Sequence, residues 1–304
     1  MSTQNALDLQ KLPIPDVLEA LDFESTLAEV KADFLELAPE FAEVINHESE
    51  PLVKQLEFIA HTKLRMIQRI NNSAKAVMLA HAANTDLDHL AANEGVKRLV
   101  ISEGNPDAVP PVLPVFESND DLRDRVQLAQ ESRTNAGPNG AYIFFARSAD
   151  ANVLDVSVTR KTPGTVILDI YILAKNNNGI ADQQLLDKVS TALNQETVLP
   201  LCDQIQLHPC TIIEYSVEAT LYFSPGPDRQ VSLAAAHAKL SQYIQQQKRI
   251  GRDINSSAIY AALHVSGVEK VEIASKNDIV IDNKSVAICT EIKLIDGGIY
   301  DDSL

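Results

Sequence analysis

The sequence is poor in basic residues and in aromatic residues. Its 304 residues include 26 Lys and Arg against 42 Asp and Glu, which gives a formal net charge of −16 at pH 7. Nucleic-acid binding needs clustered Lys and Arg to neutralise phosphates, so this balance argues against a nucleic-acid partner. Aromatic residues make up 5% and Trp is 0, which leaves little material for platforms that stack on bases or sugars. The charge favours a protein partner with basic patches.

Cysteines and long apolar runs are also scarce. Cys202, Cys210 and Cys289 form an odd and sparse set, which excludes a disulfide scaffold and predicts a reducing compartment. The segment from Met1 to Gln10 has neither the basic nor the apolar region of a secretion signal, so none is expected. No run of about 18 apolar residues occurs, so we expect neither a membrane-spanning helix nor a membrane partner.

The remaining composition is that of a packed globular protein, but its charge is unevenly placed. Hydrophobic residues are 45% and charged residues 22% of a chain long enough for about two domains, or three small ones. Residues 1–60 hold thirteen Asp and Glu against three Lys, a net of −10. Residues 61–75 then carry Lys and Arg and no acid. The first sixty residues are therefore either a docking surface or a solvated helical face.

Residues 1–95 are predicted to be helical. A short helix is expected over 16–21, and Ser25 is a candidate cap for the next one. The apolar face of that second helix would hold Leu27, Val30, Phe34 and Leu37. Near the end of the region, Thr85 is a candidate cap for a shorter helix that ends before Gly95.

A long amphipathic helix is predicted over 51–80. Pro51 suits its first turn, and apolar residues follow at spacings that are mostly three and four. Such a seam is typical of a helix that packs against a partner helix. The candidate assembly interface therefore consists of Leu52, Leu56, Ile59, Ile67, Ile70 and Val77.

The rest of the chain predicts two small α+β domains. A Pro-rich stretch over 109–114 cannot be a helix or a central strand, so we interpret 96–117 as an extended connection. Residues 118–210 alternate helical and strand patterns and form a middle domain, and residues 211–304 repeat the theme. The predicted strands are 153–158, 165–173, 205–207, 211–223, 268–274 and 286–295. The acidic tail over 296–304, with Gly297 and Gly298, is expected to be loose.

No catalytic or cofactor motif occurs in the sequence, and we predict no catalytic, cofactor-binding or metal-binding residue. Cys202, His208 and Cys210 could supply three zinc ligands, but a fourth ligand and paired spacing are missing. Neighbouring helical residues at 86, 88 and 89 diverge in direction, so a solvated face explains them better than a metal site. The segment 137–140 could form an anion-binding nest, although a plain turn between helices is the simpler interpretation.

Four stretches carry a family resemblance. Residues 87–98 fit the pattern LD-x-LA…G-x-x-R, and the second stretch runs from 120–125 through Gly137-Pro138, Ala141-Tyr142 and Ala146 to 153–156. The third is 185–189 followed by 199–203, with Leu and Cys where the related pattern RPLTD has Arg and Thr. The fourth is 250–254 with 257–259 and 267–268. In this order they resemble the baseplate J-like family of contractile-tailed bacteriophages.

The resemblance implies a structural role. Members are similar to wedge subunits that dimerise within each baseplate wedge and link neighbouring wedges into a ring. The implied partners are a second copy, other wedge and tail-fibre-connecting proteins, and the tail tube or hub region. The implied location is the tail baseplate of a virion assembled in the host cytoplasm, whether phage, headless killing particle or injection device. A hydrolase with scattered catalytic carboxylates, or an acidic adaptor outside any particle, remains an alternative.

Overall fold

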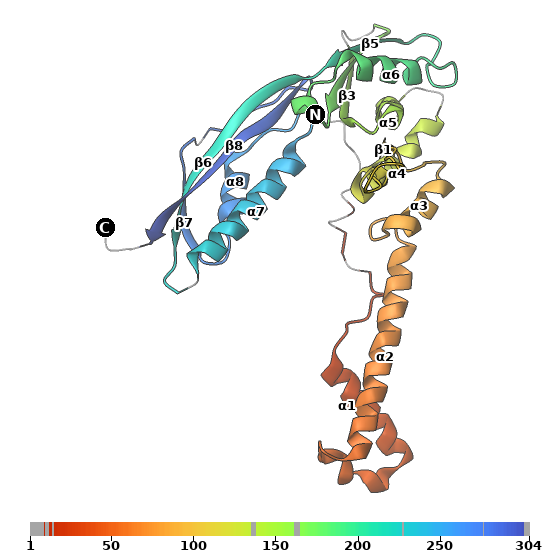
Figure 1. Ribbon diagram of the computed structural model, residues 1–304, viewed down its shortest axis with the longest axis vertical. Coiled ribbons are helices and arrows are strands. Elements are labelled where there is room, and N and C mark those ends of the chain that lie inside the picture. The colour runs from red at the N-terminus through yellow and green to blue at the C-terminus, as the bar shows by residue number, and fades with distance from the viewer. Residues whose placement is uncertain are drawn as a thin grey trace. The chain divides into compact units, whose positions relative to one another are not determined.

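The computed structural model describes residues 9, 12, 13, 15–134, 138–160, 165–226, 228–275 and 277–300 (Figure 1). These residues fall into two compact units. The helical unit comprises the described residues up to Arg98 together with Ser118–Arg123. The sheet unit comprises Leu99–Glu117 and the described residues from Asp124 onward. Each unit has buried apolar clusters of its own.

Helix α1 (Phe23–Leu37) begins at a carboxylate cap. Asp22 precedes it, and its Oδ1 accepts a hydrogen bond from Glu24 N at 3.2 Å. This bond satisfies an amide that the first turn leaves unpaired, so the predicted cap, Ser25, lies inside the helix. Leu37 was predicted on the apolar face but is exposed, because the helix ends there.

The segment before α1 is not the helix predicted over 16–21, since it forms a turn followed by extended chain. The reason is that the side-chain amide of Asn71 forms two hydrogen bonds with the backbone of Glu19. Glu19 N donates to Asn71 Oδ1 at 3.1 Å, and Asn71 Nδ2 donates to Glu19 O at 2.8 Å. Helical backbone at Glu19 would use these groups internally. After α1, two short 3-10 turns, η2 (Pro39–Phe41) and η3 (Val44–Asn46), lead to the long helix.

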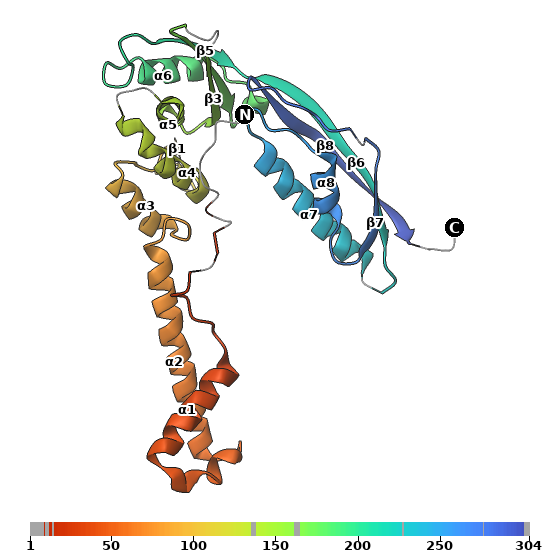
Figure 2. The ribbon, with the colours of Figure 1, turned by 180° about the vertical axis from the view of Figure 1, so that it is seen from behind.

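Helix α2 (Pro51–Ala76) is 26 residues long, somewhat shorter than predicted. Its first half packs on α1, as Figure 2 shows. The core between them consists of Val53, Leu56 and Ala60 of α2 with Val30 of α1 and Ile45. The spacing of three and four along α2 places these three residues on one helical face.

Helix α3 (Asn84–Asn93) ends in a left-handed turn. Gly95 has φ +75, and Val96 N bonds back to Ala91 O at 2.9 Å. This is a glycine-based helix stop, as the sequence predicts. Thr85, predicted as the cap, lies inside the helix instead.

The sheet unit begins with a ribbon. Strands β1 (Val100–Ser102) and β2 (Val115–Phe116) pair antiparallel, and an isolated bridge joins Asn105 to Val112 further out. The Pro-rich segment is therefore extended but folds back on itself, which the sequence did not indicate. Gly104 is needed here, because a Cβ on it would lie 2.5 Å from Val112 O.

The middle layer is a three-stranded sheet covered by helices. The sheet has the order β3-β4-β5, with β3 antiparallel and β5 parallel to β4. Helices α5 and α6 bury its apolar face, including Ile170 and Ile172. The elements, in chain order, are α4 (Asn119–Ala129), η4 (Glu131–Arg133), α5 (Asn139–Ala149), β3 (Val153–Arg160), β4 (Ile167–Ala174), η5 (Asn177–Gly179), α6 (Gln183–Leu193) and β5 (Gln204–Pro209).

The C-terminal layer repeats this design with longer strands. Its sheet has the order β7-β6-β8, with β7 antiparallel and β8 parallel to β6. Helices α7 and α8 lie on one face of it, as Figures 1 and 2 show. The elements are β6 (Thr211–Phe223), α7 (Arg229–Gln247), α8 (Ser256–Leu263), β7 (Val268–Ile273) and β8 (Ser285–Ile299). Ser256 is the first residue of α8, and its amide donates to the Asp278 carboxylate at 2.8 Å.

The expected loose tail is wrong for residues 296–299, which continue strand β8. Asp296 and Ile299 pair with Leu221 and Phe223 of β6. Gly297 is needed for packing rather than for flexibility, because a Cβ on it would lie 2.8 Å from the Tyr222 ring. Residues 301–304 lie outside the described part of the chain.

The predicted α+β fold class, with its N-terminal helical region and long amphipathic helix followed by two small α+β layers, is confirmed. The finer division at residues 95, 117 and 210 stays a prediction. Within the described residues, every helix is too short or too polar to cross a bilayer.

Candidate assembly interface

Five of the six predicted interface residues lie in α2, and the sixth, Val77, directly follows its last residue. The six residues fall into two groups. Leu56 is 3% exposed and packs with α1, and Leu52 is partly buried against the same cluster. These two residues therefore stabilise the helical unit itself. Ile59, Ile70 and Val77 are exposed, and Ile67 is half-buried.

The exposed residues form a continuous stripe with a member that the sequence analysis missed. Met66 is 64% exposed and lies between Ile59 and Ile70 in the sequence. The spacings of seven, four and seven place Ile59, Met66, Ile70 and Val77 on one helical face. We call these four residues the α2 stripe. The prediction followed Ile67 instead, although Met66 lies two full turns after Ile59.

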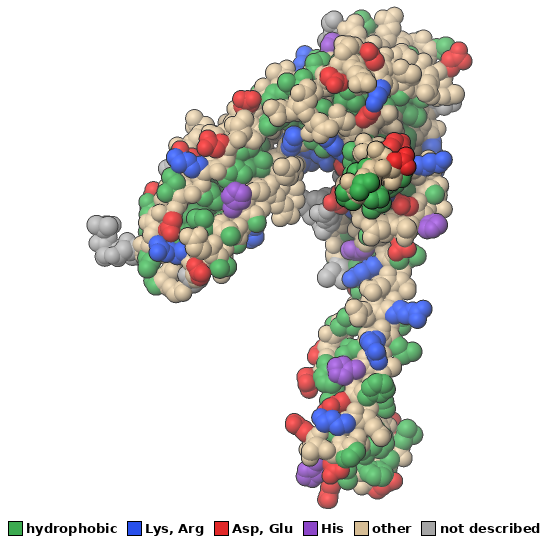
Figure 3. Space-filling model, viewed as in Figure 1, with side chains coloured by type: hydrophobic (Ala, Val, Ile, Leu, Met, Phe, Trp, Pro, Cys, Tyr) green, Lys and Arg blue, Asp and Glu red, His purple; other side chains and the backbone are tan. Residues whose placement is uncertain are grey.

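The charges around the α2 stripe change sign along the helix. Figure 3 shows acidic side chains gathered around α1 and the start of α2, and basic ones along the second half. At the middle of α2, Lys63 Nζ contacts Glu29 Oε2 at 2.8 Å, and this hydrogen bond raises the lysine pKa. Arg65 and Arg69 each directly precede a member of the stripe and are exposed. The second half of the stripe is therefore apolar with a basic border.

A second exposed apolar surface lies on the β1–β2 ribbon, which we define as residues 99–116. No Lys or Arg occurs in it, and its acidic residues, Glu103 and Asp107, are both exposed. Figure 3 shows green side chains beside red ones where Figure 1 labels β1. The exposed apolar residues are Val100, Ile101, Val109, Val112, Leu113, Val115 and Phe116. From sequence alone, this segment is predicted only as an extended connection.

The residues weighed as zinc ligands do not form a site. Cys202 is exposed, whereas Cys210 is buried with its thiol 3.7 Å from Gly179 O. Burial raises the pKa of Cys210 to about 12, so this thiol stays protonated. His208 instead lies 3.3 Å from Asp169 and stacks on Tyr171. Among the described residues, no three metal-ligating side chains come together.

The other two candidate sites also have structural explanations. Asp88, from the second weighed metal cluster, accepts a hydrogen bond from Arg98 Nε at 2.7 Å. In the candidate anion nest, Gly137 lies outside the described residues. Gly140 faces the chain's own Glu131, whose Oε2 would be 1.7 Å from a Cβ at this position. The N-terminus of α5 thus already faces an anionic group.

A polar cavity of about 460 Å³ lies in the sheet unit and bears on the hydrolase alternative. Its carboxylates include Asp150 and Asp182. Asp182 caps α6, accepting from Leu185 N at 2.8 Å. Burial favours protonation of Asp150, but hydrogen bonds from Lys188 and Asn152 outweigh it and lower the net pKa. A general acid requires a raised pKa, so Asp150 is not suited to that role.

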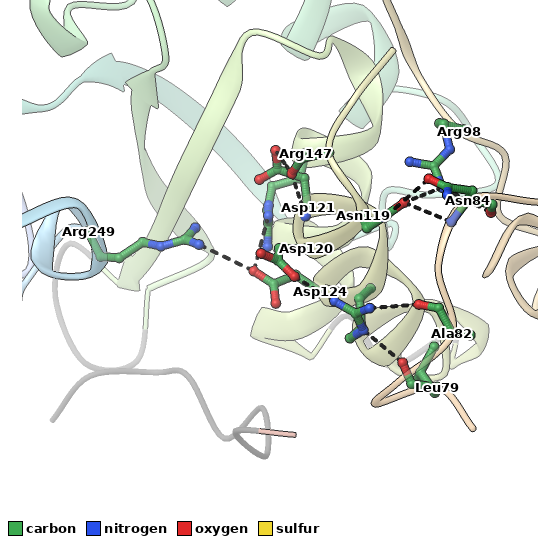
Figure 4. A network of polar contacts seen from close by, with 12 residues as sticks. Leu79, Ala82, Asn84, Arg98, Asn119, Asp120, Asp121, Asp124, Arg147 and Arg249 are labelled. Carbon is green, nitrogen blue, oxygen red and sulfur yellow. Dashed lines mark hydrogen bonds and ion pairs between the residues drawn. The ribbon is translucent and has the colours of Figure 1, made fainter. Parts of the chain in front are cut away.

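The stretches that carry the family resemblance form joints within each unit. In the helical unit, Arg123 donates to Leu79 O at 2.7 Å and to Ala82 O at 2.8 Å, as Figure 4 shows. Arg98 donates to Asn119 Oδ1 at 2.9 Å. These arginines satisfy carbonyls and side chains at the turns that flank α3.

In the sheet unit, the second and fourth stretches meet. Asp155 Oδ2 accepts from Ile250 N at 2.9 Å, and Arg249 donates to Leu154 O at 3.0 Å. Arg249 also contacts Asp124, which Arg147 approaches at 3.5 Å (Figure 4). Arg249 lies just beyond the end of α7, and no local sequence pattern predicts this joint between the two sheets.

The second and third stretches also meet, through Tyr142 and Asp203. The buried hydroxyl of Tyr142 donates to Asp203 Oδ2 at 2.5 Å. Burial and this acceptor raise the tyrosine pKa. The motif residues therefore hold the fold together, and none of these contacts assembles reacting groups.

The comparisons with known proteins agree with this picture. Family models match the chain in order: the Baseplate J-like N-terminal domain at 48–105, the central domain at 134–209 and the C-terminal domain at 215–295. A solved anti-feeding prophage baseplate, determined by cryo-EM with 6-fold symmetry, contains a chain that is 14% identical. That match covers 59% of this chain and 44% of the other at a TM-score of 0.41, which is too weak to support an inference.

A much stronger match comes from a curated protein. Baseplate protein J of Escherichia phage P2 is 47% identical over 298 residues, covering 96% of this chain and 98% of the relative. An identity of this size over nearly the whole length, together with the three domain matches in order, shows that the chain belongs to the baseplate J-like family.

Proposed function

We propose that this chain is a structural subunit of the baseplate of a contractile phage tail, required for baseplate and tail assembly. The observation that carries the proposal is the 47% identity, over 96% of the chain, with Baseplate protein J of phage P2. The protein then resides in the tail baseplate of the virion, after late synthesis and assembly in the host cytoplasm. The motif residues support a structural role, because they act as joints of the fold.

The α2 stripe is the proposed assembly interface. Its members Ile59, Met66, Ile70 and Val77 are exposed on one face, and exposed apolar patches of this kind mark protein interfaces. We propose that the chain uses its helical unit to dimerise within a wedge and to contact other wedge and tail-fibre-connecting proteins. Contact with the tail tube or hub belongs to the same proposal. The acidic charge around α1 favours partners with basic patches and predicts association that weakens with salt.

The proposed role needs no catalysis and no cofactor. Two of the carboxylates that line the cavity, Asp150 and Asp182, already serve in an ion pair and a helix cap. A relative named for the baseplate also supports a non-enzymatic role.

Electron microscopy of tails made with and without the gene tests the proposal. We expect baseplates to be missing or incomplete in its absence and to return when the gene is supplied separately. Intact baseplates without the protein would refute the role.

A paired variant tests the interface. The double substitution Ile70→Glu, Val77→Glu places charges on the α2 stripe. Both side chains are exposed, so we expect the fold to be unaffected. The matched control Gln68→Glu adds a charge on the opposite side of the same helix. We expect the double variant to fail in restoring baseplates and the control to succeed.

A further inference from the structure

The β1–β2 ribbon is built more firmly than a solvated connection requires. At its base, Leu99 N donates to Glu117 Oε1 at 2.8 Å, and Glu117 pairs with Arg125 where both side chains are buried. Further out, Asn105 and Val112 exchange backbone hydrogen bonds of 2.8 and 2.9 Å. The ribbon therefore has a fixed shape and loses little conformational freedom if it binds a partner.

The chemistry of the ribbon restricts what it can bind. Pro106, Pro110, Pro111 and Pro114 lack an N–H, so the ribbon is a poor edge for adding a further β-strand. Its contact must come from the exposed apolar side chains. Glu103 and Asp107 are its exposed charges, and the absence of Lys and Arg from 99–116 makes it anionic. The complementary surface is apolar, narrow and bordered by Lys or Arg.

The second half of α2 offers such a surface. Met66, Ile70 and Val77 are exposed there, with Arg65 and Arg69 beside them and no acid over residues 61–75. The α2 stripe runs from Ile59 to Val77, eighteen steps along the helix, or about 27 Å at 1.5 Å per residue. Each arm of the ribbon has about nine residues and is at most about 30 Å long. The two surfaces therefore agree in polarity, charge and length.

We propose that the ribbon of one copy binds the α2 stripe of a neighbouring copy, with Glu103 and Asp107 beside Arg65 and Arg69. This rests on the proposed function and deepens it, because it names the partner of the α2 stripe. The ribbon and the α2 stripe are different surfaces, and each copy carries both. A copy can therefore bind one neighbour through its ribbon and another through its α2 stripe, which is a head-to-tail contact. Such heterologous contacts build rings when the rotation closes, whereas a two-fold contact stops at a dimer.

Charge reversal in the full chain tests the contact. The ribbon variant is Glu103→Arg, Asp107→Arg, the helix variant is Arg65→Glu, Arg69→Glu, and a third variant carries all four changes. All these side chains are exposed, so folding should be unaffected. Sedimentation velocity would measure self-association across concentration and salt. We expect each double variant to associate at least about tenfold more weakly than the original chain, because like charges then face each other.

The decisive result is whether combining the two charge reversals restores self-association. The fourfold variant should regain association, and so should an equimolar mixture of the two double variants, because basic ribbons then meet acidic helices. General damage to the fold could not be repaired by a second reversal. Unchanged association in a double variant, no regain in the fourfold variant, or no self-association of the original chain at any concentration would each overturn the proposal.

A separate readout distinguishes this contact from the proposed function itself. If the gene is required for baseplates but the double variants restore them fully, the ribbon contact is refuted and the structural role stands. If baseplates form without the gene, the structural role fails, whatever the sedimentation result shows.

Discussion

The joint between the two sheets and the second half of α2 use their side chains in opposite ways. At the joint, Asp155 is buried, and its carboxylate finds its partner, Ile250 N, within the chain. Along α2, Ile70 and Val77 are 55% and 71% exposed. Buried polar groups with internal partners fix one fold, because any other arrangement leaves them unsatisfied. Exposed apolar side chains contribute little to the stability of the single chain, and they would be buried only in contact with a partner.

The largest expected effect comes from the buried ion pair at the base of the ribbon. Glu117→Ala leaves the Arg125 guanidinium buried without its carboxylate partner. Such a loss costs about 3–5 kcal/mol of unfolding free energy. Chemical denaturation of the full chain would measure it.

The matched control for this change is Glu103→Ala in the same ribbon. Glu103 is exposed, so we expect its loss to change stability by no more than about 0.5 kcal/mol. Equal effects of the two substitutions would show that the ribbon is not anchored at Glu117.

The next effect separates the two faces of α2. Leu56→Ala removes a side chain that is 3% exposed and should cost about 2–4 kcal/mol through the cavity it leaves. Ile70→Ala, on the same helix, should leave the stability of the free chain within about 0.5 kcal/mol. Thermal unfolding of the two variants side by side would measure the contrast. A large loss from Ile70→Ala would mean that the α2 stripe is covered within the chain.

This contrast also shows how far sequence patterning reaches. Spacing predicted that α2 is a long amphipathic helix, but it could not divide the apolar residues between α1 and a partner. Both faces have the same chemistry, and only the position of α1 decides which is covered. The strand β6, by contrast, was predicted with its observed ends, because its alternation continues unbroken until shortly before the Pro-Gly-Pro segment at 225–227.

At the joint, Asp155→Ala should cost about 1–3 kcal/mol, because Ile250 N is left buried without an acceptor. Asp155→Asn keeps an acceptor oxygen at this position and should cost less. Urea denaturation of both variants would order them. If the alanine variant were as stable as the original chain, the hydrogen bond would not hold the sheets together.

The joints and the ribbon lay beyond sequence analysis for a common reason. Asp155 and Ile250 are 95 residues apart, and no local pattern indicates that they meet. The fold-back of the ribbon depends on pairing at Asn105 and Val112, which a Pro-rich stretch conceals. Family resemblance marked Asp155, Ile250, Tyr142 and Asp203 as important, but it did not say which residues meet.

The smallest effect is at the surface pair of Asp150 and Lys188, and it depends on pH. Lys188 Nζ lies 2.6 Å from Asp150 Oδ2, and the folded-state pKa of Asp150 is below its ordinary value. A depressed carboxyl pKa contributes stability above the unfolded pKa of about 3.9, and this is lost as pH falls through the folded value. Asp150→Asn keeps the acceptor for Asn152 N and removes only the charge.

We therefore expect Asp150→Asn to be less stable than the original chain by about 0.5 kcal/mol at pH 7, since exposed pairs contribute little. The difference should shrink as pH falls through the folded-state pKa of Asp150, because the original carboxyl is then also neutral. Lys188→Met should show the same pH dependence, because it removes the other half of the pair. Thermal unfolding from pH 2.5 to 7 would measure both variants. A difference as large at pH 2.5 as at pH 7 would show that packing rather than charge stabilises this pair, and that the surface pair behaves like the buried joint.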